Sequence, residues 1–372
     1  MRMPRPRRVR PDAGSHPAMN YRLPPTLAAF RRAAIVAIVI AVAAGGWSLY
    51  WLVLATGLRD GVVAWAEQSR GEGLDVRFDT LDLAGYPSSA RVVIGRPTVS
   101  VSDGTWSWSG DGAELAVSPL APRHVTVSVA GAQAASFGAD SRRMAFRGTV
   151  RALTAEIIDD ADEPAGSLTL RDLVMNEVGG SGTLAVGRFD ADAKGAVAPE
   201  DAAGAPTVEI EASFGDVRLP WQWALPLGER ITGGALEARL MGTLEPGPWP
   251  DALARWRDAG GTVEIARLEI EYGPLDLNAN GTLALDGDNQ PIGAFTTRIQ
   301  GFFQAIDALR RRRLVDDRAA ITAKLVLGAL ARKGADGERP ILSIPLTLQD
   351  RLLYAGPVPL FEVPPIRWEE AP

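Results

Sequence analysis

The stretch Ala33–Ala55 reads AAIVAIVIAVAAGGWSLYWLVLA and contains no charged residue. At ~1.5 Å of helical rise per residue, roughly 23 residues cover the ~30 Å hydrocarbon core of a bilayer. The stretch therefore predicts a transmembrane helix. A cleaved signal peptide is the open alternative, because the small residues Ala41 and Ala43 suit a cleavage site. Signal peptides have apolar cores of ~7–15 residues, so this longer run favours an uncleaved anchor.

Residues that flank the anchor predict its orientation. Trp47, Tyr50 and Trp51 lie near its C-terminal end, where amphipathic rings favour the headgroup level. The preceding tail holds a single acid, Asp12, and these arginines: Arg2, Arg5, Arg7, Arg8, Arg10, Arg22, Arg31 and Arg32. By the positive-inside rule the N-terminus is cytoplasmic. We expect a basic cytoplasmic tail (1–32), an anchor in the bacterial inner membrane (33–55) and a periplasmic β-rich domain (56–372).

Composition restricts the class of the exported part. The chain is 46% hydrophobic and 23% charged, which is typical of a globular protein. Its net charge is -6 in spite of the basic tail, so the exported part is acidic. This argues against a nucleic-acid partner, because phosphate binding needs a basic face. The chain has no cysteine, which excludes disulfides and thiolate chemistry.

Alternation of apolar and polar residues predicts that most of the chain after Leu74 is sheet. Asp103-Gly104, Asp111-Gly112 and Asn280-Gly281 each predict a tight hairpin turn, because both residue types accept positive φ. The expected strands lie within 76–83, 92–102, 125–129, 146–158, 168–174, 182–189, 207–214, 234–244, 262–272, 275–285 and 341–368. Helical spacing predicts helices over 58–70, 250–258, 302–315 and 316–333. The fold class is thus mainly β (α+β), an extended antiparallel sheet with a few covering helices after one transmembrane helix.

Catalytic motifs are largely excluded by counting. The histidines are His16, in the tail, and His124, beside a strand, so a histidine-rich metal site cannot form. Gly179–Thr183 reads GGSGT and lacks the strand-to-helix context of a nucleophile elbow. The acidic run at 159–163 is more typical of a solvated loop than of a calcium site. We therefore expect a protein that is not an enzyme and needs no cofactor, with a carboxylate-dependent hydrolase left as an alternative.

Two kinds of surface cluster are candidates for contact with lipids. Trp106 with Trp108, and Trp221 with Trp223, each place two indole rings on one face of a strand. Packing in the core is the alternative for both pairs. A basic run follows the expected helix at 302, formed by Arg310, Arg311, Arg312 and Arg313. These guanidinium groups suit anionic headgroups, although the adjacent Asp316 and Asp317 suggest local ion pairing instead.

Several stretches together resemble an uncharacterised alphaproteobacterial envelope family, domain of unknown function 2125. They are Trp65 in a short helix after the anchor, Leu83-Ala84-Gly85-Tyr86-Pro87, Arg96-Pro97, Asn280 to Asp286 with Pro291-Ile292-Gly293 and Gly301-Phe302-Phe303, Ile344 to Asp350, Gly356-Pro357 and Pro364-Pro365. The resemblance implies a single N-terminal anchor and a periplasmic β-rich domain, and it implies no catalytic residue. The strand pattern is more distantly similar to AsmA-like anchored envelope proteins, which are linked to lipid homeostasis.

From these observations we expect a membrane-anchored periplasmic envelope protein that binds or shields lipids on a sheet surface or groove. Its expected partners are the inner membrane and either lipids or envelope proteins. A scaffold for an envelope complex is the main alternative. It would present the acidic surface and proline-rich edge strands to other proteins.

Overall fold

A computed structural model describes residues 27–71, 73–138, 143–160, 163–195, 206–220, 223, 226–332, 339–356, 358–366 and 368. The chain divides into two compact units, residues 1–50 and residues 51–372. Most of the tail expected at 1–32, including Arg2 to Arg22 and His16, lies outside the described residues.

The first element is one long helix, α1 (Leu27–Gly71). Its segment from 30 onward is long and apolar enough to cross a membrane, and it is the one such helix in the described part of the chain. Within the first unit most of the large apolar side chains of α1 are exposed, and Trp47 is half-buried. The helix expected at 58–70 exists but does not start anew after the anchor, because Gly57 and Gly61 sit inside α1 without ending it.

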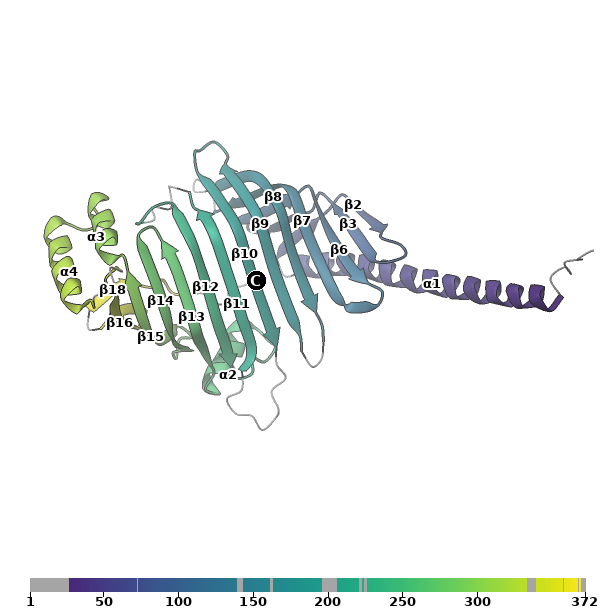
Figure 1. Ribbon diagram of the computed structural model, residues 1–372. Coiled ribbons are helices and arrows are strands. Elements are labelled where there is room, and N and C mark those ends of the chain that lie inside the picture. The colour runs from purple at the N-terminus through teal and green to yellow at the C-terminus, as the bar shows by residue number, and fades with distance from the viewer. Residues whose placement is uncertain are drawn as a thin grey trace, which may run out of the picture. The chain divides into compact units, whose positions relative to one another are not determined.

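The second unit is built on one sheet in which every neighbouring pair of strands is antiparallel (Figure 1). The 18 strands follow one another across the sheet nearly in chain order. They are β1 (Leu74–Arg77), β2 (Thr80–Ala84), β3 (Ala90–Gly95), β4 (Thr98–Val101), β5 (Trp106–Gly110), β6 (Gly112–Ser118), β7 (Ala121–Phe137), β8 (Met144–Ile158), β9 (Ala165–Glu177), β10 (Thr183–Gly195), β11 (Pro206–Arg218), β12 (Arg230–Met241), β13 (Thr262–Tyr272), β14 (Leu275–Leu285), β15 (Pro291–Gln300), β16 (Leu342–Gln349), β17 (Leu352–Ala355) and β18 (Val358–Glu362).

The first six strands form three longer strands, β1 with β2, β3 with β4 and β5 with β6, and each longer strand bends between its two halves. β3 pairs with β6 while β4 pairs with β5, and β5 and β6 both pair with the same side of β7. The hairpin predicted at Asp103-Gly104 is confirmed, since it joins the paired strands β4 and β5. The hairpin predicted at Asp111-Gly112 is wrong. Asp111 bends a continuing strand there, and its Oδ2 accepts the N–H of Ala132 at 2.9 Å.

The hairpin predicted at Asn280-Gly281 is also wrong, because both residues lie inside β14. Gly281 faces Phe295 on β15, and a Cβ at Gly281 would come within 2.2 Å of the Ala294 carbonyl oxygen. The glycine is thus required by close approach of the neighbouring backbone and not by a turn.

A transverse crease crosses the middle of the sheet. It is defined by Gly131 on β7, Arg151 on β8, Asp172 on β9, Gly187 on β10 and Asp216 on β11. Gly131, Asp172 and Asp216 have positive φ, at 86°, 49° and 54°. The ladder of paired residues is broken where each of the five lies, and between β7 and β8 the register also shifts there. Such irregularities bend strands and increase their twist.

Three further helices belong to the second unit: α2 (Trp249–Asp258), α3 (Phe302–Arg311) and α4 (Asp317–Leu330). Each lies where helical spacing predicts one, and α3 and α4 are consecutive between β15 and β16. Asp316 caps α4, since its side chain accepts the N–H of Ala319 at 2.7 Å. The mainly β architecture with a few helices is confirmed.

Candidate functional site

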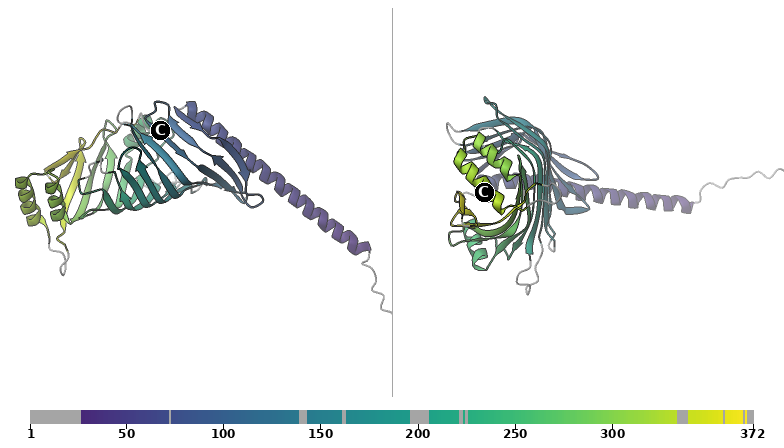
Figure 2. Two further views of the ribbon diagram at one scale, coloured as in Figure 1. Left: turned by 90° about the horizontal axis from the view of Figure 1, so that it is seen from above. Right: turned by 60° about the vertical axis from the view of Figure 1, so that its left-hand side comes forward.

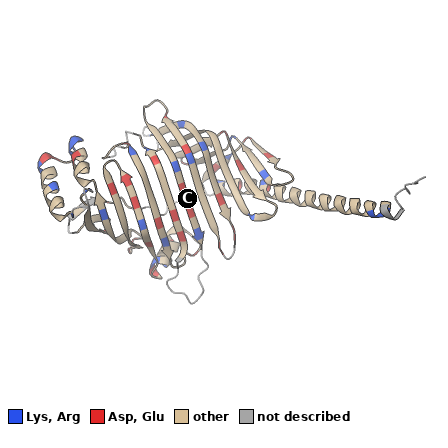
Figure 3. Ribbon diagram, in the orientation of Figure 1, with Lys and Arg blue, Asp and Glu red and all other residues tan. Residues whose placement is uncertain are grey.

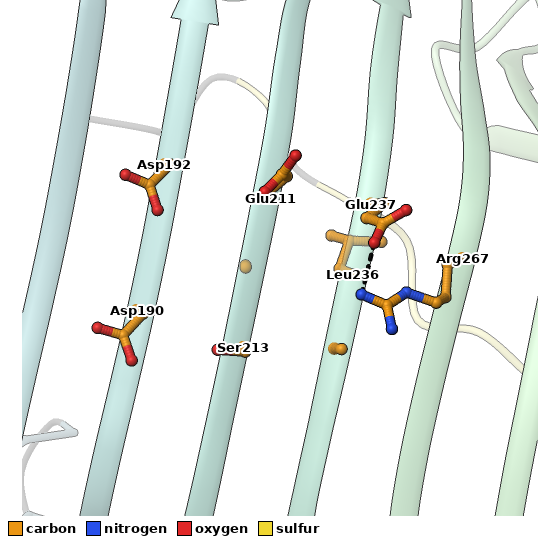
Figure 4. Close-up of a pocket in the computed structure, with 9 residues that line it drawn as sticks. Asp190, Asp192, Glu211, Ser213, Leu236, Glu237 and Arg267 are labelled. Carbon is orange, nitrogen blue, oxygen red and sulfur yellow. Dashed lines mark ion pairs between the residues drawn. The ribbon is translucent and has the colours of Figure 1, made fainter.

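The sheet of the second unit has one polar face. Cross-strand partners on this face form a row that runs from β7 to β12 through Thr126, Glu156, Ser167, Asp192, Glu211 and Glu237. Charged residues are spread over the same strands (Figure 3). In the close-up of Figure 4, Arg267 pairs with Glu237 at 2.5 Å, next to the carboxylates of Asp190, Asp192 and Glu211. This face is therefore suited to water.

The opposite face is apolar, because side chains alternate between faces along each strand. One row of cross-strand partners runs from β2 to β16 and contains no charged residue: Leu83, Val92, Leu115, Val127, Ala155, Leu168, Ala191, Ala212, Leu236, Leu268, Ala279, Thr297 and Ile344. A parallel row includes Ile157, Ala193, Ile210, Ala238 and Ile265. The apolar surface is thus continuous across the sheet.

The crease preserves this apolar face on both sides of itself. On β9, Leu170 below the crease and Leu173 above it are three positions apart, so strict alternation would place them on opposite faces. Asp172, which lies between them and has a positive φ, shifts the alternation by one residue, so that both leucines face the same side. Above the crease, Val150 and Met175 are buried on the apolar side. The apolar face therefore consists of two apolar areas, one on each side of the crease, that are joined at the bend.

The apolar face lines the inside of a curve. Figure 2 shows the sheet of the second unit bending strongly, with α2 inside the bend. Helix α2 packs on the apolar rows, because Leu253 and Trp256 line one cavity with Leu240, Val263 and Leu283 of the sheet. This cavity has a volume of about 260 Å³, and only apolar residue types line it. We call this concave apolar surface the groove.

Both ends of the groove are covered by other parts of the second unit. At the end near β1, Trp51 of α1 donates its indole N–H to the Ser89 carbonyl at 2.7 Å. Ala55, Val62 and Ala66 follow on one buried side of α1. At the other end, Ile366 and Trp368 join the cavity under α2.

The middle of the groove is exposed to solvent. Ile157 is 53% exposed, and Leu168 and Ile210 are each 37% exposed. All three lie in the apolar rows on β8, β9 and β11. A sheet normally buries its apolar face against a second layer. A contiguous apolar area that no second layer covers marks a surface for a ligand or a partner.

The residues singled out for lipid contact are only partly brought together. Trp106 and Trp108 lie half-buried on β5, opposite Phe137 and Ala135 of β7 on the apolar side. The Trp108 indole N–H donates to Gln133 Oε1 at 3.0 Å. Trp223 is exposed outside the groove strands, and Trp221 lies outside the described residues.

Arg310 to Arg313 lie elsewhere, where α3 ends and the chain turns into α4. All four are exposed, and Arg310 pairs with Asp307 at 3.9 Å and with Asp317 at 3.4 Å. The local ion pairing weighed from sequence therefore exists for Arg310.

Residues expected in the anchor fall in both units. Ala33 is exposed in the first unit, where the rings of Trp47 and Tyr50 are 6.1 Å apart. Trp51 and Ala55 belong to the second unit. Ala55 is fully buried there, so the C-terminal end of the expected anchor contacts protein.

The described titratable residues with a clearly shifted pKa lie outside the groove. His124 lies on β7, and its Nε2 is 3.4 Å from Glu156 Oε2. Hydrogen bonds from Thr105 lower the pKa of Asp103 in the β4–β5 turn, and a hydrogen bond from Lys324 lowers the pKa of Asp307 on α3. Neither carboxylate lies in the groove.

Sequence reasoning missed Ile157, Leu168 and Ile210 as candidates. Each belongs to an alternating run that is visible in the sequence. Their significance comes from strand register, which aligns them across the sheet, and from their exposure, since no described element of the chain covers them. The tryptophan pairs were predicted to contact lipid because two indole rings at alternate positions are recognisable from local sequence alone.

Comparison with known proteins identifies one family. The model of a family described as "Uncharacterized protein conserved in bacteria (DUF2125)" matches residues 51–364. No curated protein and no solved structure matches the chain.

Proposed function

This chain belongs to the uncharacterised bacterial family DUF2125, and we propose that it holds the acyl chains of lipids in its groove. The proposal is carried by one observation, the uncharged row that crosses the sheet from β2 to β16 while its middle stays open to solvent. The protein acts by binding and shielding and not by catalysis.

The hydrophobic effect supplies the affinity. Burial of each CH₂ group contributes about 0.8 kcal/mol, so an acyl chain along the open rows is stabilised without any specific polar contact. Lipid would also cover Ile157, Leu168 and Ile210, which water now contacts. The charged convex face would remain hydrated around the bound chains.

The dimensions of the groove favour several lipid chains over one. The row from β2 to β16 spans twelve strand spacings, which at about 4.8 Å each is roughly 60 Å along the sheet. One leaflet of a bilayer core is only ~15 Å thick. Lipids arranged side by side along the rows would fill this length.

The proposed location follows from α1 and the charge of the flanking residues. Helix α1 would cross the inner membrane, with the arginine-rich tail in the cytoplasm and the sheet in the periplasm. In that position the groove would begin next to the membrane from which its lipids come.

The test compares lipid bound to the full-length protein and to two matched triple variants. Ile157→Gln, Leu168→Gln and Ile210→Gln together place amides in the groove. Thr126→Gln, Ser167→Gln and Thr169→Gln place the same amides on the polar face of neighbouring strands. Each protein would be purified from membranes in detergent, and the phospholipid extracted from it would be quantified by mass spectrometry. Lipid that stays bound to the anchor would be measured on a peptide of residues 1–50 and subtracted.

We expect the groove variant to lose most of its bound lipid and the polar-face variant to retain it. Equal lipid in all three proteins would overturn the proposal. Loss of a co-purifying protein from the groove variant, with lipid unchanged, would instead support the scaffold function.

A further inference from the structure

The helical hairpin formed by α3 and α4 exposes an apolar surface that the groove does not explain. Ile321 is 60% exposed and Leu325 is 70% exposed, one helical turn apart on α4. Val326 and Leu330 form a second exposed pair with the same spacing. An isolated exposed leucine is ordinary, but two adjacent exposed pairs on one short helix are a patch.

The inner side of α4 is already occupied. Ala320 is buried, and Lys324 Nζ lies 2.6 Å from Asp307 Oδ1 of α3. A Cβ at Gly328 would lie 3.3 Å from Cζ of Phe303, so α3 and α4 are in close contact there. These contacts fix which side of α4 faces α3. The apolar pairs therefore face away from α3 as a consequence of the packing.

Basic charge is concentrated beside this apolar patch. The segment Phe302–Leu330 contains six basic and three acidic residues, in a chain whose net charge is -6. Arg311, at the end of α3, and Arg312 and Arg313, in the connection to α4, are exposed. Figure 3 shows basic residues at this connection. Apolar side chains next to arginines are the composition of a helix that lies in a membrane interface.

The hairpin and the end of α1 lie at opposite ends of the sheet. The strands follow nearly in chain order, so β1 to β4 lie at one end while α3 and α4 lie between β15 and β16 near the other (Figure 1). A surface that binds the hairpin would therefore lie at the end of the groove opposite to α1.

From the exposed apolar pairs and the adjacent arginines, we propose that the α3–α4 hairpin docks on an anionic lipid bilayer. The arginines bind the headgroups, and Ile321 and Leu325 insert among the acyl chains. The chemistry of the patch matches both parts of such a surface. The groove would then have a membrane contact at each end, one through α1 and one through the hairpin.

Membrane docking is tested with the full-length protein reconstituted by α1 into phosphatidylcholine vesicles. The probe is a second population of fluorescent vesicles made of phosphatidylglycerol and phosphatidylethanolamine, and capture of these vesicles is measured. Each arginine near an anionic surface contributes about 1 kcal/mol, which is roughly a factor of five in affinity. We expect Arg311→Ala, Arg312→Ala and Arg313→Ala together to weaken capture on the order of 100-fold or more.

A matched control removes the same charge elsewhere. Arg147→Ala, Arg218→Ala and Arg230→Ala change exposed arginines on the polar face of the sheet, and capture should remain within twofold of the unmodified protein. If both triple variants lost capture equally, the hairpin would have no special role and the proposal would be wrong. Equal capture of phosphatidylcholine vesicles would likewise contradict a headgroup-dependent contact.

A second readout detects insertion directly. Because the chain has no cysteine, Leu325→Cys can be labelled at one site with an environment-sensitive fluorophore. Emission should shift to the blue when anionic vesicles are added, while Thr169→Cys on the polar face should not respond. A shift that depends on protein concentration without vesicles would show a second copy as the occupant and would overturn the proposal. The vesicle-capture and fluorescence results do not depend on the lipid content of the groove variant. Lipid binding in the groove and membrane docking of the hairpin can therefore be disproved independently.

Discussion

At the scale of single residues, the groove depends on a few backbone conformations that side chains rarely adopt. Asp172 and Asp216 occupy the left-handed region, which aspartate tolerates better than most residues. Within the crease, Arg151 Nη1 on β8 lies 2.9 Å from Asp172 Oδ2 on β9. Gly187 lies beside Asp216, and a Cβ at Gly187 would be 2.9 Å from the Asp216 Cβ. Small and acidic residues thus let apolar side chains face inward on both sides of the bend.

This crowding predicts the effect of a single methyl group. Gly187→Ala should lower the free energy of unfolding by about 1–3 kcal/mol, because the new Cβ clashes with the stem of Asp216. Denaturant unfolding of the full-length protein in detergent, followed by tryptophan fluorescence, measures the change. Asp216→Gly removes the opposing Cβ, so the double variant should recover most of the loss. Absence of recovery would show that the clash is not the cause.

At the scale of elements, strand and helix positions were largely predictable and their connections were not. Alternation located β8, β11 and β14, and helical spacing located α2, α3 and α4. The turns predicted at Asp111-Gly112 and Asn280-Gly281 failed because such pairs also serve inside strands. There they allow a bend or the close approach of a neighbour. Only the partner strand distinguishes these uses, and a local pattern does not contain it.

The groove itself could not be located from local sequence for a related reason. The three-residue step from Leu170 to Leu173 breaks the period of two, so the pattern alone assigns opposite faces to the two halves of β9. The positive φ of Asp172 and the burial of Val150 and Met175 show that both halves are apolar on the same side. Predicting the sheet was thus possible from sequence, whereas predicting a continuous concave face required the pairing.

The contact between α3 and α4 predicts a dependence on pH. The hydrogen bond from Lys324 holds the pKa of Asp307 below its ordinary value of 3.8. A lowered folded-state pKa stabilises the fold above the ordinary value, and this stabilisation is lost as pH falls from 3.8 through the folded-state pKa. The unmodified protein should therefore melt at a higher temperature than Asp307→Asn at pH 6.

Thermal melting at two pH values isolates this contact from other carboxylates. The difference in Tm between the unmodified protein and Asp307→Asn should shrink as the pH is lowered from 6 to below 3.8, because protonation of Asp307 removes the ionised carboxylate. A difference that stayed constant between these pH values would mean that the ionised carboxylate does not hold the helices together.

At the scale of the whole second unit, the fold is an up-and-down sheet that extends in one direction. Each strand places polar side chains on the convex face and apolar side chains on the concave face. The groove therefore lengthens with every strand from β2 to β16. Among the described helices, α1 packs near the first strands of the groove and α2 packs over β12 to β15 (Figure 2). The architecture therefore explains how one sheet forms a long apolar surface.

The most direct test of the groove is site-specific photo-crosslinking in cells. A photoreactive phenylalanine analogue replaces Leu168, in the open apolar row, or the adjacent Thr169, on the polar face of the same strand. After irradiation, the purified full-length protein is analysed by mass spectrometry for covalently attached lipid. If acyl chains lie in the groove, lipid adducts form at position 168 and not at position 169. Adducts at neither position, or equally at both, would contradict lipid binding in the groove.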